Sequence, residues 1–212
     1  LAYWLDHAGK LSRESRKRMR LMWLSSLARC LFEPLERAVE SRGLARYEDM
    51  PAPIFILGHW RSGTTHLYNI LGKSPDLGYV SPLAAGMPGD MLALGSLIKP
   101  VLERALPKTR LIDRVEVNSD SPQEDEFGLS CLQHLSFLNA LYFPSRFEEL
   151  FNKGIYFEGA TQIEVASWRD VMRNYVRKLY VHQKGRRVVL KNPAHTARIP
   201  ELLKIWPDAR FI

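Results

Sequence analysis

The chain has 212 residues, of which 46% are hydrophobic, 25% charged and 10% aromatic, and this composition excludes wholesale disorder. The longest apolar candidate, residues 91–102, is interrupted by Lys99 and Pro100, so no run in the sequence is long enough for a membrane-spanning helix. The 30 lysines and arginines outnumber the 23 aspartates and glutamates. The resulting net charge of +7 suits a polyanionic partner, such as a phosphorylated small molecule, an anionic membrane or a nucleic acid.

The first predicted element is a long basic helix over residues 11–42. Leucines recur along it at helical spacing, and arginines and lysines fill much of the remainder. Pro34 is expected to kink or split this helix. A connector rich in proline and glycine follows, so we predict a helical arm over residues 1–50 and a second domain over residues 51–212. The leucine stripe is best explained by docking of the arm onto that domain, with peripheral contact to a membrane surface as the second interpretation.

The two cysteines, Cys30 and Cys131, form no CxxC pair and lie among apolar neighbours. We predict that both are buried free thiols in a reducing compartment, which favours a cytoplasmic location.

The rest of the chain alternates short apolar runs with helical patterns. Three runs are typical of strands buried on both faces, because they are brief and continuously apolar: 53–57, 187–190 and 210–212. Helices are predicted over 63–73, 91–100, 121–131, 161–183 and 199–206. The third of these helices is expected to begin with Ser121 as its N-cap and Pro122 as its first residue. This alternation predicts an α/β fold with a P-loop-like parallel sheet flanked by helices.

The most informative local pattern is a loop, Gly58-His59-Trp60-Arg61-Ser62-Gly63-Thr64-Thr65, between a predicted strand and a predicted helix. The two glycines have the spacing of a phosphate-binding P-loop, and Thr65 occupies its Ser/Thr position. Position 64 holds Thr where a nucleoside triphosphatase has Lys, and the cation is instead Arg61, which can grip an anion through two hydrogen bonds. No predicted strand ends in the Asp of a Walker-B motif. The residues 58–65, hereafter the phosphate loop, therefore predict a site for a phosphate-like group without the usual magnesium-triphosphate arrangement.

The phosphate loop resembles that of the sulfotransferase family, in the bacterial-type branch with an Arg-Ser-Gly-Thr-Thr core. Two further stretches share the resemblance, one formed by 113–118 and 122–127 and the other by 190–199 and 206–212, and together they extend it over residues 51–212. It implies 3′-phosphoadenosine 5′-phosphosulfate as donor and adenosine 3′,5′-bisphosphate as product. It also implies that the 5′-phosphosulfate is held by Arg61, Ser62, Gly63, Thr64, Thr65 and the adjacent His66. The family's 3′-phosphate site would lie beyond Ile212, so we expect the given chain to be truncated before it.

Sulfuryl transfer needs a base for the acceptor proton and a cation near the leaving phosphate. Ligands of parallel sheets bind beyond the carboxyl ends of the strands, so the phosphate loop and the segment after residue 190 should face one crevice. His195 is the first candidate for the base, because histidine accepts a proton at neutral pH. Lys191 is expected to steady the sulfuryl group or its bridging oxygen. The acidic triplet Glu124-Asp125-Glu126 competes as the base, and Glu126 is the member least explained by helix capping.

We therefore expect an enzyme that moves a sulfuryl group to a hydroxyl, or an amine, of a small molecule, lipid or glycan, with no nucleic-acid partner. No metal is expected either, since the six histidines show no ligand spacing. Two alternatives stay open: a kinase-like phosphotransferase that uses the same loop, and a non-enzymatic basic binding module that uses the arm. The acceptor pocket is expected to involve residues 74–107 and 136–159, whose aromatic residues suit a lipid, steroid, phenol or sugar equally well.

Overall fold

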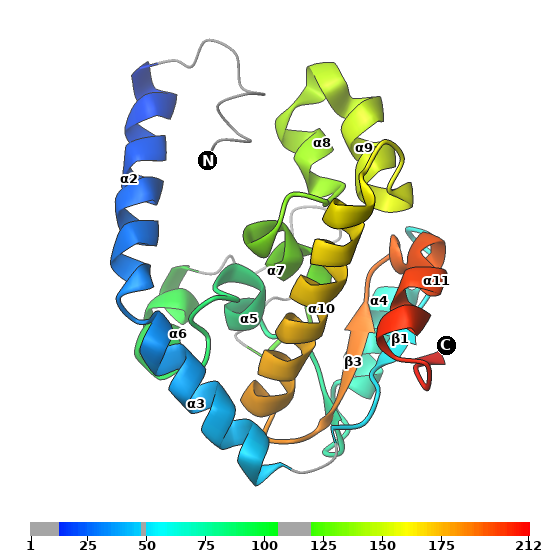
Figure 1. Ribbon diagram of the computed structural model, residues 1–212. Helices are drawn as coiled ribbons and strands as arrows, with labels where there is room; N and C mark the ends of the chain where they lie inside the picture. The colour runs from blue at the N-terminus through cyan, green and yellow to red at the C-terminus, as the bar shows by residue number, and fades with distance from the viewer. Residues whose placement is uncertain (1–12, 48–49, 106–119) are drawn as a thin grey trace.

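The computed structural model describes residues 13–47, 50–105 and 120–212 (Figure 1). Its centre is a four-stranded sheet with the order β2-β3-β1-β4, in which every neighbouring pair is parallel. The strands are short, with the bounds β1 Ile54–Ile56, β2 Leu77–Gly78, β3 Arg187–Lys191 and β4 Arg210–Phe211. In the central pair Ile56 lies opposite Lys191, so the carboxyl ends of β1 and β3 lie side by side.

Helices cover both faces of the sheet because its central strands are apolar on both faces. On β1, Phe55 shares a hydrophobic cluster with residues of α10 and α11, whereas the next residue, Ile56, packs with Tyr68 of α4 on the opposite face. These helices are α4 Thr64–Leu71, α10 Gln162–His182 and α11 His195–Ile205, and α10 crosses the front of the view in Figure 1. The predicted α/β fold with a parallel sheet between helices is thus confirmed.

The remaining helices lie around this centre. Two precede the sheet, α2 Arg13–Cys30 and α3 Glu33–Arg46, and the others are α5 Pro82–Gly86, α6 Gly95–Ala105, α7 Asp125–Leu132, α8 Leu138–Tyr142 and α9 Phe147–Tyr156. A 3₁₀ turn at Pro144–Arg146 joins the last two, which lie together at the top of Figure 1. Over the described ranges, no helix is both long and apolar enough to cross a bilayer.

Three predicted helix boundaries are wrong. Helix α6 continues past Pro100, which is exposed, so water can satisfy the carbonyl that loses its backbone partner. Helix α7 begins at Asp125 with Glu124 as its N-cap, rather than at Ser121, because the backbone N–H of Gln123 donates to the carbonyl of Val80 at 2.8 Å and holds the preceding residues outside the helix. Helix α11 begins at residue 195 rather than 199, since its first turn lacks the apolar spacing on which the prediction depended.

The predicted break in the N-terminal arm is confirmed, because Pro34 falls in the first turn of α3, where a missing N–H costs little. The predicted docking of the leucine stripe is wrong for the described residues. Leu21, Leu24 and Leu27 of α2 are all exposed, and Figure 1 shows α2 standing away from the sheet. Neither cysteine forms a disulfide, as predicted, but both are exposed rather than buried, and each lies near the end of a helix.

The second helix of the arm is fixed to the body through one buried carboxylate. Glu36 of α3 accepts hydrogen bonds from the backbone N–H groups of Leu92 at 3.1 Å and Ala93 at 2.6 Å. It also pairs with Lys178 of α10 at 2.5 Å, and Lys178 donates a further bond to the carbonyl of Gly89. A buried carboxylate needs several hydrogen-bond and charge partners, so these contacts fix α3 in one position against α10.

Candidate active site

The phosphate loop connects β1 to α4 through a backbone that requires glycine at two positions. Gly58 has φ 146° and Gly63 has φ 85°, and a Cβ on Gly58 would come within 2.8 Å of the Thr64 side chain. Arg61 also adopts the left-handed region, with φ 64°. Gly63 is the N-cap of α4, and no side chain caps this helix end. The N–H groups of its first turn therefore have no partner within the helix and carry the positive end of its dipole.

Hydrogen bonds hold the loop in this shape and link it to the start of α11. Ser62 Oγ donates to the carbonyl of His59 at 2.6 Å, which closes the loop on itself. The Gly58 N–H donates to Thr196 Oγ1 at 3.3 Å, so α11 begins directly beside the loop. Arg61 and His66 are both exposed, and Arg61 makes no ion pair with any residue in the described ranges. The loop thus presents Arg61 to solvent beside the uncapped first turn of α4.

The end of β3 places a second cation beside this loop. Lys191 is the last residue of β3 and lies opposite Ile56, two residues before Gly58. Its side chain is 7% exposed and forms an ion pair with Glu124, the N-cap of α7. The carboxyl ends of parallel strands form the usual ligand site of such sheets. Lys191 and Glu124 therefore lie at the edge of the sheet where we expected a ligand to bind.

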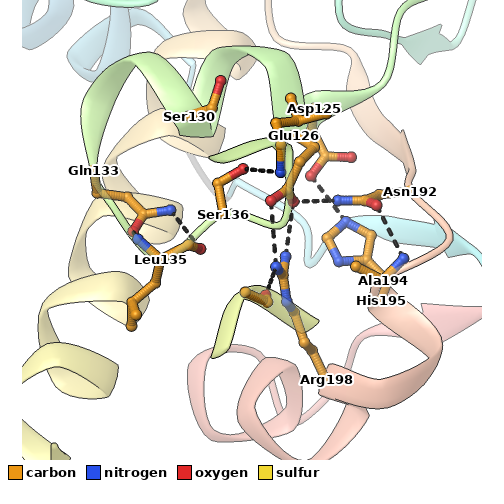
Figure 2. Close-up of polar contacts among 12 residues, drawn as sticks. Asp125, Glu126, Ser130, Gln133, Leu135, Ser136, Asn192, Ala194, His195 and Arg198 are labelled. Atoms are coloured by element: carbon orange, nitrogen blue, oxygen red, sulfur yellow. Dashed lines mark hydrogen bonds and ion pairs between the residues drawn. The ribbon is translucent and has the colours of Figure 1, made fainter. Parts of the chain in front are cut away.

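Two more contacts between acidic and basic side chains join the acidic triplet to α11. His195 Nε2 lies 2.9 Å from Asp125 Oδ2, and both side chains are completely buried. Arg198 lies 2.8 Å from Glu126, again with essentially no exposure of either side chain. Three consecutive acidic residues therefore meet three basic residues of the segment 191–198, each acid with its own partner. Figure 2 shows the two buried pairs, with α7 above and α11 below.

Glu126 lies at the centre of this network. Burial by itself would raise the pKa of its carboxyl group, but the charge and hydrogen bonds of Arg198, with further bonds from Ser136 and Asn192, hold the pKa below its ordinary value. Asn192 Nδ2 donates to Glu126 at 2.6 Å, as drawn in Figure 2. Arg198 also donates to the carbonyl of Gly154 on α9. Glu126 thus stays ionised and ties α7, α9 and α11 together.

The structure brings the predicted residues together, but in environments that the sequence did not reveal. His195 was expected at a strand end facing the crevice, whereas it is enclosed by Asp125 and by the Phe55 ring, whose centroid lies 5.1 Å from that of the imidazole. Glu126 was expected at the acceptor, whereas it is enclosed by Arg198. The catalytic roles of these two residues and of Lys191 stay predictions. The sequence analysis missed the pairing of residues 124–126 with the segment 191–198. Its only sign in the sequence is a run of three acidic residues and, more than sixty residues later, a Lys, a His and an Arg at helical spacing.

The first of the two further stretches that resemble sulfotransferases begins with residues 113–118, which lie outside the described residues. Among the residues that are described, no three His, Cys, Asp or Glu side chains are grouped as metal ligands.

Comparison with known proteins places the chain in a family. The model of the sulfotransferase family matches residues 53–212. Two curated proteins, both named omega-hydroxy-beta-dihydromenaquinone-9 sulfotransferase Stf3, from Mycobacterium bovis and Mycobacterium tuberculosis, are 32% identical to it over 181 residues. The match covers 84% of this chain and 45% of each relative, so the chain spans less than half the length of these relatives.

Two solved structures share the fold. The sulfotransferase STF9 from Mycobacterium avium superposes with a TM-score of 0.53 at 20% identity, over 77% of this chain and 42% of that one. The sulfotransferase STF1 from Mycobacterium tuberculosis gives a TM-score of 0.51 at 19% identity, over 84% of this chain and 49% of that one. The resemblance of the phosphate loop is therefore confirmed over the greater part of the sequence, and the chain belongs to the sulfotransferase family.

Proposed function

We propose that the protein transfers a sulfuryl group from 3′-phosphoadenosine 5′-phosphosulfate to a hydroxyl, or an amine, of an acceptor. One observation carries the proposal: the Arg61-bearing phosphate loop at the end of β1 lies directly beside Lys191 at the end of β3. An uncapped helix N-terminus, with one cation in the preceding loop and another at the adjacent strand end, suits a doubly anionic phosphosulfate. Membership of the sulfotransferase family supports the same donor.

The residues present fit this donor. The N-terminus of α4 has no capping side chain, and the space beside Gly63 is open, with nothing within 4 Å of where a Cβ would lie. Arg61, Ser62, Gly63, Thr64, Thr65 and His66 would hold the 5′-phosphosulfate. When bound, the donor supplies an activated sulfuryl group; the acceptor oxygen bonds to sulfur, the bond from sulfur to the bridging oxygen breaks, and the bisphosphate leaves. Lys191 would stabilise the negative charge that develops on the bridging oxygen.

The acceptor proton needs a base that can reach it, and burial separates the candidates. The side chains of His195 and Glu126 are enclosed, whereas that of Glu124 is 19% exposed and touches Lys191. We therefore propose that Glu124 is the base that takes the proton of the acceptor. His195 and Glu126 would then be positioning residues that hold Glu124 in place. In this assignment the two buried pairs fix the start of α7 against α11, and so fix Glu124 beside the transferring group.

The activity is tested with ³⁵S-labelled donor and a panel of probe acceptors, namely geraniol, 2-naphthol, methyl β-glucoside and octylamine. The longest natural form of the protein should move the label to at least one probe, and Arg61→Ala should move none. Retention of all label in the donor, or transfer of the γ-phosphoryl group of ³²P-labelled Mg-ATP instead, would contradict the proposal.

The assignment of the base predicts that Glu124→Gln lowers kcat by about 100-fold or more while the affinity for the bisphosphate stays within about twofold. Glu33→Gln, an exposed glutamate on α3, is the matched control and should leave kcat unchanged. If His195 is the base instead, Glu124→Gln should keep its kcat, whereas His195→Asn should lose turnover with the affinity for the bisphosphate unchanged. That result would overturn the assignment to Glu124.

The proposal extends to the partners and the organisation of the chain. The acceptor would be a small molecule, lipid or glycan, and the Stf3 relatives are named for a menaquinone derivative. We propose a cytoplasmic location, an N-terminal arm over 1–50 and a catalytic domain from residue 51. The exposed leucines and basic residues of α2 support peripheral membrane contact through the arm.

A further inference from the structure

The phosphate loop carries an aromatic side chain that contacts rings outside the loop. Trp60, between His59 and Arg61, contacts two rings of the α8–α9 region: Phe137 with centroids 6.0 Å apart and Phe151 at 6.2 Å. Phe151 in turn stacks on Phe147, with centroids 5.4 Å apart and planes inclined by 17°. These four residues, 60, 137, 147 and 151, form a continuous row of rings, hereafter the aromatic shelf.

One side of the aromatic shelf is anchored and part of it is open. Phe137 is buried with Ile155 and Ala194, and Phe151 packs against this cluster and against a second one formed around α8 and α9. Trp60 and Phe147, at the two ends of the row, are 40% and 45% exposed. Large rings held in place by a core yet open to solvent are typical of a binding surface rather than of packing.

The aromatic shelf begins at the reacting centre proposed above. Trp60 immediately precedes Arg61, and Ala194 beneath the shelf immediately precedes His195. A molecule lying on the rings would therefore place its nearest end beside the phosphate loop. The aromatic shelf is therefore an apolar extension of that site, because residues of the two are neighbours in the sequence.

The charged side chains of α9 and its preceding turn argue against a sugar as the occupant of the aromatic shelf. Arg146 is paired with Glu149, and Lys153 with Glu164, so these charged side chains of α9 and its preceding turn are already engaged. A sugar on an aromatic platform needs hydrogen-bond partners for its hydroxyls, whereas a hydrocarbon needs only apolar area.

We propose that the aromatic shelf binds the hydrocarbon part of an apolar hydroxyl acceptor and directs its hydroxyl toward Arg61 and Lys191. This inference rests on the proposed sulfotransferase function and names the class of its acceptor. The occupant is an alcohol or phenol on an unsaturated hydrocarbon skeleton, which stacks on Trp60 and Phe147 and leaves its oxygen at the loop.

The test measures binding of geraniol and of methyl β-glucoside to the longest natural form of the protein saturated with adenosine 3′,5′-bisphosphate. Geraniol should bind more tightly than the glucoside, and Phe147→Ala should weaken geraniol binding by about tenfold. Phe32→Ala is the matched control, because Phe32 is also an exposed phenylalanine at a helix start, as the N-cap of α3. Trp60→Ala should weaken geraniol as Phe147→Ala does, and Trp60→Phe should restore most of the affinity.

The outcomes separate the two proposals. If the bisphosphate binds and Phe147→Ala leaves the affinity for geraniol unchanged, or if the glucoside binds better and depends on Phe147, the aromatic shelf is not an apolar acceptor site while the enzyme function stands. If the bisphosphate itself does not bind, the sulfotransferase proposal fails first.

Discussion

Replacing Arg61 with alanine should weaken the binding of adenosine 3′,5′-bisphosphate by about 100-fold or more. Charge-assisted hydrogen bonds from a guanidinium to a phosphate are among the stronger single contacts in proteins, and two of them together are worth about 3 kcal/mol. The backbone of Arg61 lies in the left-handed region within the phosphate loop, so we expect its side chain to reach a bound phosphate without a change in the backbone. The measurement is a calorimetric titration of the variant and the parent.

Two variants show whether this effect comes from the loop or from charge in general. Arg61→Lys keeps the charge but loses the planar fork, so its affinity should fall between those of parent and Arg61→Ala. The triple change of Arg13, Arg16 and Lys17 to glutamine removes three exposed charges of α2 and should alter the affinity by less than about threefold. A triple variant that loses as much affinity as Arg61→Ala would favour a basic binding module that acts through the arm.

The second large effect concerns stability. Arg198→Met should lower the free energy of unfolding by about 3–5 kcal/mol, because it leaves the buried carboxylate of Glu126 without its cation. Chemical denaturation measures this loss. The matched control is Arg173→Met, which breaks the exposed Arg173–Asp170 pair and should cost less than about 0.5 kcal/mol.

The pair itself is tested by the double variant Glu126→Gln/Arg198→Met. This variant removes both charges together and should regain at least about half of the lost stability. Equal losses in the single and double variants would show that Arg198 acts through its contacts with Gly154 or with the Trp168 ring rather than through Glu126.

The same pair makes stability depend on pH with a defined sign. The folded-state pKa of Glu126 lies below its ordinary value of 4.5, so the carboxylate stabilises the fold above the unfolded-state pKa. This contribution should be fully present at neutral pH and should disappear as the pH falls from about 4.5 through the lower folded-state pKa. In Glu126→Gln this part of the acid transition should be absent.

Local chemistry explains what could be predicted from the sequence. The apolar run 53–57 predicted β1, because a short, continuously apolar run is typical of a strand buried on both faces. The two glycines predicted the phosphate loop, and both have positive φ in the structure. Helix α10 was placed within a residue at each end, since it combines a capping box at Thr161 with long apolar periodicity.

The features that sequence reasoning missed depend on contacts between distant residues. Helices α8 and α9 are short and joined by a single turn, so they leave little periodicity to detect. The three acid–base pairs join residues 67 to 72 positions apart, which no local pattern reveals. Burial changes the interpretation of His195 in the same way: its place just beyond β3 follows from the strand before it, but its enclosure by Asp125 comes from a separate helix.

The central claim is that the phosphate loop is built for a nucleotide phosphosulfate rather than for a nucleoside triphosphate. The most direct measurement is a calorimetric titration of the longest natural form of the protein with adenosine 3′,5′-bisphosphate and, separately, with ATP and magnesium. Thr64 replaces the lysine that triphosphate loops use, and Arg61 supplies the cation instead, so the bisphosphate should bind and Mg-ATP should bind far more weakly. Tighter binding of Mg-ATP, retained in Arg61→Ala, would contradict the sulfotransferase proposal.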